Sequence, residues 1–249
     1  MSTQVQKQFN ILLVGDACED TYTYGYVNRI SPEAPVPVFE PHYQLVKDGM
    51  ASNVCKNLET LECTVNFLHG KVSKKNRLID HRTKQQLLRI DHDAESEPIT
   101  FETSIPPVYD AIVVSDYNKG TVSYELIQEL VGNVPVFVDT KKTDLARLSG
   151  CYIKINALEQ SRATSLPSKE RLIITHGGHG AEWNGRGFPA ETAGDVTDVC
   201  GAGDTFLAAL VYKFLEKNDM AEAIKFANKA AAVTVQHVGV YAPRLEEIE

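Results

Sequence analysis

A glycine-rich turn followed by a carboxylate is the stretch of this sequence best suited to chemistry. Residues 198–206 read DVCGAGDTF, and the apolar residues after them recur at helical spacing, so Gly201, Ala202 and Gly203 are expected to begin a helix. The first N–H groups of a helix lack internal partners and attract anions, phosphate above all. Asp204 would repel a phosphate there unless it accepted a proton from an attacking hydroxyl. The alternative interpretation is that Asp204 caps the helix and the glycines form a tight turn.

Other candidate ligand groups lie where predicted strands end. Residues 9–15, 109–115, 135–139, 151–155 and 171–175 are apolar runs typical of buried parallel strands, and the pattern at 124–131 predicts a helix between two of them. In such a sheet, ligands bind at the carboxyl ends of the strands. Asp16 and Asp20 follow the first run and could bind hydroxyls, or merely accept hydrogen bonds within their own turn. Gly49 and Asn53 lie at the start of another predicted helix.

A proline-punctuated ribbon covers residues 22–40, where three prolines between 32 and 37 exclude a helix. We expect an extended, apolar segment that needs a cover, either as a lid over a site or against a partner subunit. Arg29 lies in this ribbon, as a possible anion contact or as an ordinary surface arginine. Residues 64–69 and 85–91 are predicted strands, the second of them belonging to the lid, and the basic residues 71–77 are predicted to form a loop.

Composition limits the classes of function. The chain has 249 residues, 43% of them hydrophobic, which suits one domain (1–249) better than two equal domains. A net charge of −8 argues against a broad nucleic-acid or membrane surface, so a phosphorylated ligand must be bound by local groups such as Arg29, Lys141 or a helix N-terminus. The five cysteines form no CxxC pair, and neither a signal-peptide pattern nor a membrane-length apolar run is visible, which predicts a cytoplasmic protein.

Three other chemistries are less well supported. Cys200 could act as a nucleophile, but no base stands next to it in the sequence. His176 and His179 could bind a metal, but a third ligand at recognisable spacing is missing. An oxidoreductase that binds a dinucleotide would need G-x-G-x-x-G after the first strand, whereas residues 15–20 read GDACED.

From about residue 11 to residue 240, the chain resembles the ribokinase-like (PfkB-type) sugar kinases. Gly201-Ala202-Gly203-Asp204, preceded by Asp198, is similar to the most specific motif of that family. Residues 156–159 (NALE) resemble its N-x-x-E motif, and residues 175–180 (THGGHG) resemble its T-x-G-x-x-G loop. The resemblance implies that residues 201–203 form an anion hole and that Asp204 is the base. It also implies Mg²⁺ bound through water by Glu159, and ATP contacts from Asn156, Glu159, Thr175, Gly177, Gly180 and Asn228.

Four further stretches resemble the heptose-7-phosphate kinase group within this family. They are Gly15-Asp16 with Asp20, residues 28–38 (NRISPEAPVPV), residues 115–120 (SDYNKG) and residues 139–144 (DTKKTD). The resemblance implies a three-layer α/β/α sandwich with a mostly parallel sheet and a β lid formed by residues 21–45 and 77–92. The exposed apolar ribbon predicts in addition a homodimer through that lid. A sugar or sugar phosphate would be the substrate. Arg29 would reach its phosphate, and the sugar would face Asp16, Asp20, Gly49, Asn53 and Lys141.

The chain departs from the family pattern on the sugar side. Met50 stands where the family has a second glycine, and little sequence separates His69 from Leu87 or Glu159 from Arg171. These departures predict that the choice of sugar has shifted while phosphoryl transfer survives. The alternative is a catalytically silent relative that binds a sugar or nucleotide as a regulator.

Overall fold

The apolar runs form one eight-stranded sheet in the order β12-β11-β10-β9-β8-β7-β1-β4. This sheet is seen in a computed structural model, which describes residues 8–100, 108–191 and 194–249. The six strands from β10 to β4 in this order are mutually parallel, and β11 and β12 are antiparallel additions at one edge. The strands are β1 (Asn10–Gly15), β4 (Thr64–His69), β7 (Ala111–Asp116), β8 (Val136–Thr140), β9 (Tyr152–Asn156), β10 (Leu172–Thr175), β11 (Ala181–Trp183) and β12 (Arg186–Phe188).

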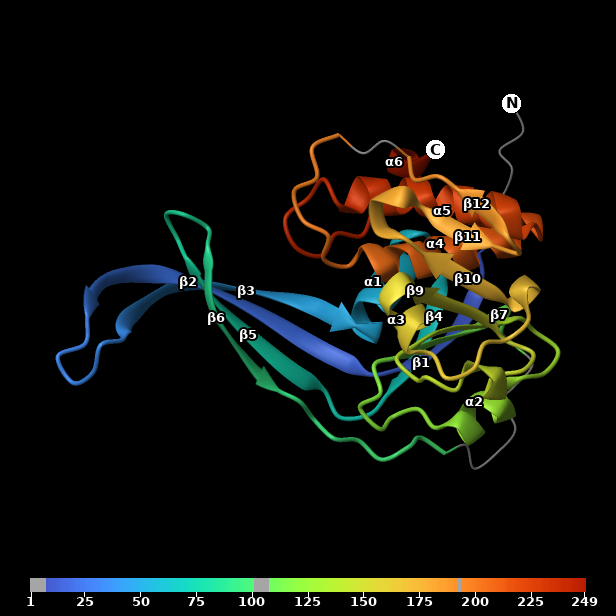
Figure 1. Cartoon of the computed structure of the whole chain (residues 1–249), viewed down its shortest axis with the longest axis horizontal. Coiled ribbons are helices and arrows are strands. Elements are labelled where there is room, and N and C mark those ends of the chain that lie inside the picture. Colours follow the sequence, from blue (N-terminus) through green and yellow to red (C-terminus); the bar gives the residue numbers. More distant parts are fainter. Residues whose placement is uncertain (1–7, 101–107, 192–193) are drawn as a thin grey trace.

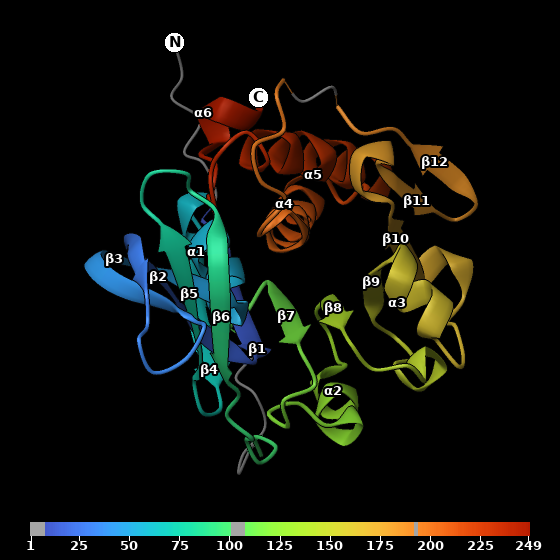
Figure 2. The same cartoon turned by 60° about the vertical axis from the view of Figure 1, so that its left-hand side comes forward.

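Helices cover both faces of this sheet, which confirms the three-layer fold (Figure 2). Alternate residues of β1 point into two separate cores: Ile11 and Leu13 pack against α1, α4 and α5, and Leu12 and Val14 pack with α2. The period of two is what a strand buried on both faces requires. The helices are α1 (Ala51–Thr60), α2 (Tyr124–Leu130), α3 (Ala157–Arg162), α4 (Ala202–Lys217), α5 (Met220–Thr234) and α6 (Leu245–Ile248). None of them, within the described ranges, is long and apolar enough to cross a membrane.

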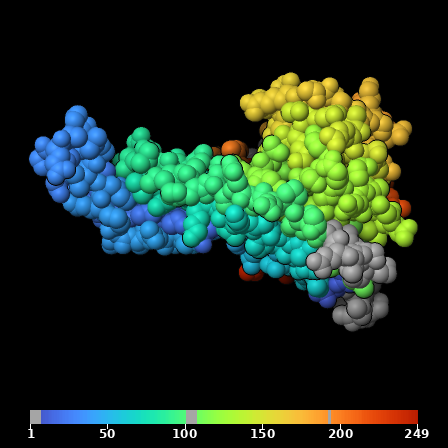
Figure 3. All heavy atoms as spheres, turned by 90° about the horizontal axis from the view of Figure 1, so that it is seen from below, coloured from blue at the N-terminus to red at the C-terminus, as the bar shows by residue number. Residues whose placement is uncertain are grey.

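A second sheet, in the order β3-β2-β5-β6, projects from this body as a long arm (Figures 1 and 3). Its strands are β2 (Ala17–Ile30), β3 (Pro37–Met50), β5 (Ser73–Asp80) and β6 (Gln86–His92). We call this sheet the lid. The proline-punctuated ribbon is extended as expected, with bends at residues 32–36 between two strands, and the predicted strand at 85–91 is β6.

The prediction of a loop at residues 71–77 is wrong, because β5 begins at Ser73. This strand lies between β2 and β6, so hydrogen bonds to both neighbours satisfy its backbone. The lid is not enclosed by helices, and Lys74 and Lys75 can therefore occupy a central strand while their ammonium groups remain near water. A local surplus of lysine was a poor indicator of a loop for this reason.

The root of the lid is continuous with the carboxyl end of the main sheet. Only Asp16 separates β1 from β2, and β3 passes directly into α1 at Met50. The backbone of Asp16 joins these parts: its N–H donates to Ser115 O (3.1 Å), and its carbonyl accepts from the N–H of Ala51 (3.0 Å). The fold therefore places the inner end of the lid beside the ends of strands β1 and β7.

Candidate active site

The turn at residues 201–204 begins α4, as predicted. Gly201 is the N-cap in the left-handed conformation, with φ of 79°. A Cβ on this residue would lie 2.8 Å from Asn53 Nδ2, so both the backbone angle and the close approach favour glycine. The N–H groups of the first helical turn have no acceptor within the helix, and the dipole of this 16-residue helix adds partial positive charge there. This end of α4 is therefore suited to bind an anion.

The carboxylate of Asp204 does not cap the helix. It is 7% exposed, and among the described residues no side-chain cap hydrogen bond is formed at this N-terminus. Its Oδ2 accepts a hydrogen bond from Asn53 Nδ2 (2.8 Å), and its Oδ1 accepts one from the hydroxyl of Tyr117 (3.0 Å). Burial raises the pKa of Asp204 to about 6, with Asp139 adding to the rise, while the bonds from Asn53 and Tyr117 and the charge of Lys154 oppose it. A buried carboxylate with a pKa near neutrality is suited to general-base chemistry.

Asp16 and Asp20 lie at the root of the lid, both of them buried. One oxygen of Asp16, Oδ2, accepts the backbone N–H groups of Tyr117 (2.7 Å) and Lys119 (3.2 Å). Its other oxygen, Oδ1, is buried without a hydrogen-bond partner among the described residues. Buried acceptors are rarely left unpaired, so a ligand hydroxyl is a natural partner for this atom.

Asp20 is held by an ion pair with Arg77 on β5, at 3.1 Å. Gly49, on the neighbouring strand β3, packs against the same carboxylate, because a Cβ there would lie 2.7 Å from Asp20 Oδ2. The next residue, Met50, is buried and adopts a positive φ of 54° that side chains rarely tolerate. The sugar-side candidates Asp16, Asp20, Gly49 and Asn53 are thus brought together around the lid root.

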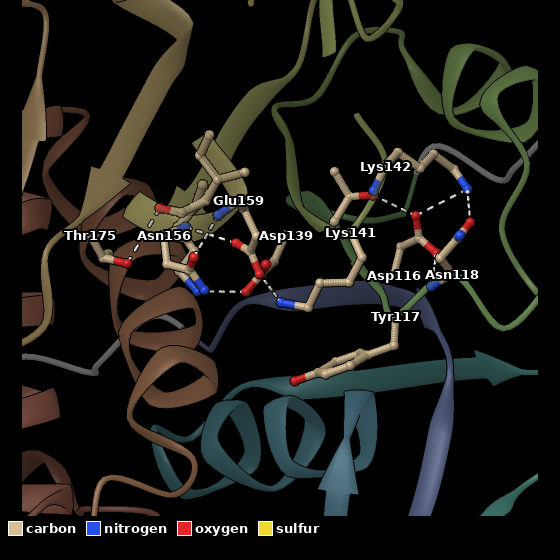
Figure 4. Close-up of polar contacts among 12 residues, drawn as sticks. Asp116, Tyr117, Asn118, Asp139, Lys141, Lys142, Asn156, Glu159 and Thr175 are labelled. Carbon is tan, nitrogen blue, oxygen red and sulfur yellow. Dashed lines mark hydrogen bonds and ion pairs between the residues drawn. The ribbon is translucent and has the colours of Figure 1, made fainter. Parts of the chain in front are cut away.

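Arg29 and Lys141 are not part of the group of candidates around the lid root. Arg29 is exposed, near the outer end of β2, roughly 30 Å along the strand from Asp20 at about 3.3 Å per residue. Lys141 follows β8 and pairs with Glu159, while its ammonium lies 5.1 Å from the centre of the Tyr117 ring (Figure 4). Burial lowers the pKa of Lys141, but Asp139 and Glu159 outweigh it and leave the pKa raised. Lys141 therefore lies between the sugar-side and nucleotide-side candidates.

A cavity of 740 Å³ borders the same turn, with Ala202 and Gly203 among its lining residues. It is large enough for a nucleotide by the usual size of ligand pockets. Its walls come from β9, β10, α4 and α5 and include the ATP candidates Asn156, Thr175, Gly177, Gly180 and Asn228, together with Lys154 and Gly203. Five of the six ATP candidates from the sequence thus line one cavity, and the sixth, Glu159, is not among its lining residues.

The N-x-x-E residues form a reciprocal capping box at the start of α3. Asn156 Oδ1 accepts the N–H of Glu159 (2.9 Å), and Glu159 Oε2 accepts the N–H of Asn156 (2.8 Å). The other carboxylate oxygen of Glu159 is engaged by Lys141. Because both oxygens already have protein donors, this carboxylate fits Mg²⁺ through bound water better than by direct ligation. Within the described residues, no group of three His, Cys, Asp or Glu side chains is placed to hold a metal directly.

Two residues that were not predicted from the sequence also face the turn. Lys154 is 5% exposed, forms an ion pair with Asp139 (2.6 Å), and its Nζ lies 3.1 Å from the position of a Cβ on Gly203. A lysine inside the otherwise apolar run CYIKI (residues 151–155) was the available signal. Tyr117 belongs to a stretch that resembles the family, but its contact with Asp204 spans 87 residues of sequence and no local pattern indicates it.

The thiol of Cys200 is poorly placed for nucleophilic chemistry. Burial and the nearby carboxylate of Asp198 raise its pKa, and its sulfur stays protonated near neutral pH. Asp198 has a structural role, because its carboxylate accepts the N–H groups of Cys200 (3.0 Å) and Gly239 (2.8 Å). It thereby ties the turn to the loop after α5.

Comparisons with known proteins show which family this sequence belongs to. Residues 115–248 match the model of the pfkB family of carbohydrate kinases. The bifunctional protein HldE of Nitratiruptor sp. is 32% identical over 300 aligned positions, covering 96% of this chain and 64% of the relative, and that of Campylobacter curvus is 31% identical, covering 98% and 65%. The chain thus spans slightly less than two thirds of these relatives. Since 300 positions exceed the 249 residues of this chain, the relative also carries residues that this chain lacks within the matched region.

Solved structures show the same fold at low sequence identity. The ribokinase of Thermotoga maritima matches with a TM-score of 0.72 and 16% identity, over 96% of this chain and 98% of that one. An Arabidopsis thaliana ribokinase, solved with ribose and ATP, matches with a TM-score of 0.71 and 14% identity, over 97% and 98%. The match over residues 115–248, which is more than half of the sequence, shows that this chain belongs to the pfkB family of carbohydrate kinases.

Proposed function

We propose that the protein transfers the γ-phosphoryl group of ATP to a hydroxyl of a sugar or sugar phosphate similar to heptose 7-phosphate. The observation that carries this proposal is the position of Asp204. Its buried carboxylate, with a pKa of about 6, stands in the first turn of α4, next to Gly203 in the wall of the 740 Å³ cavity. It also accepts a hydrogen bond from Tyr117, whose backbone N–H donates to Asp16 at the lid root. A sugar at the lid root and a nucleotide in the cavity would meet at this residue.

In this proposal, Asp204 orients the acceptor hydroxyl and accepts its proton. A carboxylate is a weak base toward an alcohol, so the proton moves late, and alignment and charge stabilisation supply most of the acceleration. The N–H groups of residues 201–204 bind the transferred phosphoryl oxygens. Lys154 adds a positive charge beside the same turn, where developing negative charge must be stabilised.

ATP and Mg²⁺ are the cofactors that we propose. The nucleotide would occupy the cavity lined by Asn156, Thr175 and Asn228, and Glu159 would hold water molecules of the Mg²⁺ ion. Asn228 also stabilises the cavity wall, because its amide donates to the carbonyls of Phe188 (3.1 Å) and Pro189 (3.0 Å). The bound ion would supply charge neutralisation between the phosphates of ATP.

On the sugar side, the charges nearest the lid root differ from the sequence-based assignment. Arg77 and Lys47 flank the ring of Tyr22, with Arg77 Cζ 5.4 Å and Lys47 Nζ 5.7 Å from its centre. The Nε of Arg77 is buried without a hydrogen-bond partner among the described residues. We propose that Arg77 binds the existing phosphate of the substrate, because Arg29 lies too far along β2 to do so within one protomer.

The lid supports a proposal of homodimerisation. Large apolar side chains are exposed on its strands and on the bend between β2 and β3, which is unfavourable in water unless a second surface covers them. These side chains are Ile30, Val36, Tyr43, Leu45, Val46, Leu87, Leu88 and Ile90. We propose that a second copy of the chain covers them. The five cysteines are free, which supports a reducing compartment such as the cytoplasm.

A coupled ADP-release assay across sugars and sugar phosphates tests the proposed function. Asp204→Asn should lower kcat by a factor on the order of a hundred or more and leave ATP binding nearly unchanged, because it removes the proton acceptor but not the N–H groups. Equal turnover by the Asn variant would contradict the assignment of the base. Release of ADP from no substrate, with ATP still bound, would instead favour the silent relative.

A further inference from the structure

The proposed base is held by hydrogen bonds on both of its oxygens, and one of the donors is a tyrosine. Tyr117 directly follows β7, and its hydroxyl donates to Asp204 Oδ1 at 3.0 Å. On the opposite side, Asn53 donates to Oδ2 at 2.8 Å. A carboxylate offers about four lone-pair sites, so one site on each oxygen remains for an acceptor hydroxyl. The two donors therefore orient the base without saturating it.

The backbone of Tyr117 is fixed independently of its side chain. Its N–H donates to Asp16 Oδ2 (2.7 Å), and that oxygen also accepts from Lys119 (3.2 Å). The preceding residue, Asp116, is fully buried and accepts from Thr140 Oγ1 (2.5 Å) and pairs with Lys142 (3.2 Å). One short loop thus contacts both the sugar-side carboxylate and the base.

The surroundings of Asp204 show why a neutral donor is useful there. Asp139 on β8 faces it with a negative charge, Lys154 on β9 with a positive one, and Asn53 on α1 with a neutral amide. Lys141 and Glu159, which face Tyr117, are paired with each other. A hydrogen bond donated to the charged form of a carboxyl favours that form. The hydroxyl opposes the effects of burial and of Asp139 without adding a second cation.

We propose that Tyr117 is a positioning residue for the phosphoryl-transfer reaction: its hydroxyl keeps the Asp204 carboxylate charged and directed toward the acceptor. This inference rests on the proposed function, in which Asp204 is the base. It predicts that loss of the hydroxyl moves the titration of Asp204, whereas a residue that only packs in the fold would leave that titration in place. The burial that raises the pKa of Tyr117 well above its ordinary value keeps the phenol protonated and able to donate at all working pH values.

The test compares the parent with Tyr117→Phe by ¹³C NMR titration of the Asp204 carboxyl and by the pH profile of kcat/KM. Loss of a hydrogen-bond donor to the charged carboxylate should raise the midpoint of the Asp204 titration by about one pH unit from its value near 6. The resulting loss of kcat/KM is roughly fivefold at pH 6, because a smaller fraction of the Asp204 carboxyl is ionised there. At about pH 8.5 the carboxyl is almost fully ionised in both proteins, and the loss nearly vanishes. KM for ATP should stay constant, since the walls of the nucleotide cavity come from β9, β10, α4 and α5.

Tyr124→Phe is the matched control. Tyr124 lies in α2, and its hydroxyl accepts a hydrogen bond from the N–H of Asp144 (3.1 Å). Loss of this hydroxyl should change neither the Asp204 titration nor the pH profile of kcat/KM. A second variant, 3-fluorotyrosine at position 117, keeps the ring and donates more strongly, and should shift the midpoint downward. Unchanged midpoints in both position-117 variants would overturn the proposal. The NMR titration needs no turnover, so a parent that phosphorylates nothing would refute the proposed function and still leave Tyr117 tested.

Discussion

Lys154 offers a test of whether the charge beside the turn serves catalysis or only the fold. Its ammonium is buried, pairs with Asp139 at 2.6 Å and lies beside Gly203 in the wall of the cavity. Lys154→Met keeps most of the side-chain volume and removes the charge. Two losses are expected, one in stability and one in phosphoryl transfer, and they have different causes.

The stability loss follows from the partner. Lys154→Met leaves Asp139 as an uncompensated buried charge, and breaking such a pair typically costs about 3–5 kcal/mol. Lys154→Met combined with Asp139→Asn removes both charges and should recover most of this loss. The kinetic loss should not recover: removing one group that stabilises transition-state charge costs roughly 10²–10³ in kcat, and the double variant lacks that group as well.

Urea unfolding and the coupled ADP-release assay on the parent, both single variants and the double variant separate these effects. The reasoning holds if the double variant is nearly as stable as the parent but at least a hundredfold slower. A double variant with parental kcat would show that Lys154 serves only the buried ion pair. Asp139→Asn alone provides the matched control, because it removes the partner and keeps the ammonium beside Gly203.

Three further outcomes are expected. The free energy of unfolding should fall as pH rises from about 4 to about 6, because folded Asp204 retains a proton that the unfolded chain releases. A difference of about two pKa units between the two states amounts to about 3 kcal/mol, and Asp204→Asn should flatten this dependence in thermal unfolding. Met50→Gly should be close to neutral for stability, because relief of about 1–3 kcal/mol of positive-φ strain offsets the lost burial, and it should raise kcat/KM for heptose 7-phosphate relative to smaller sugars if the side chain enters the pocket. Sedimentation at micromolar concentration should show a dimer, and a stable monomer would contradict burial of Leu45 and Val46 by a second copy.

The main sheet was predictable because its strands are buried on both faces. Runs such as residues 135–139 contain little besides apolar residues, and in a chain of this size that pattern strongly favours a strand at the centre of a covered sheet. The lid was harder, since a sheet that is not enclosed by helices tolerates lysine and asparagine in its central strand β5. Family motifs located the lid, but local composition misplaced one of its strands.

The site was predictable where function depends on the backbone and less so where it depends on distant side chains. Glycines at 201 and 203 mark a helix start within a few residues, and the sequence displays them directly. The contact of Tyr117 with Asp204 exists only because the fold brings the end of β7 to the start of α4. Lys154 meets Asp139 only because they are register partners on β8 and β9. No spacing within the sequence could reveal either pair.

Ion pairing distinguishes Asp204 as a base from the neighbouring carboxylates of Asp20, Asp139 and Glu159. Asp20 is paired with Arg77, Asp139 with Lys154 and Glu159 with Lys141, so each of these three negative charges has a cation beside it. Within the described part of the chain, Asp204 is contacted instead by two neutral donors, an amide and a phenol. Neutral donors orient a buried carboxylate but compensate its desolvation only in part, and its pKa accordingly rises to about 6. A carboxylate fully paired with a cation would be a weaker proton acceptor, so contact with neutral donors in place of an ammonium is itself a functional feature of Asp204.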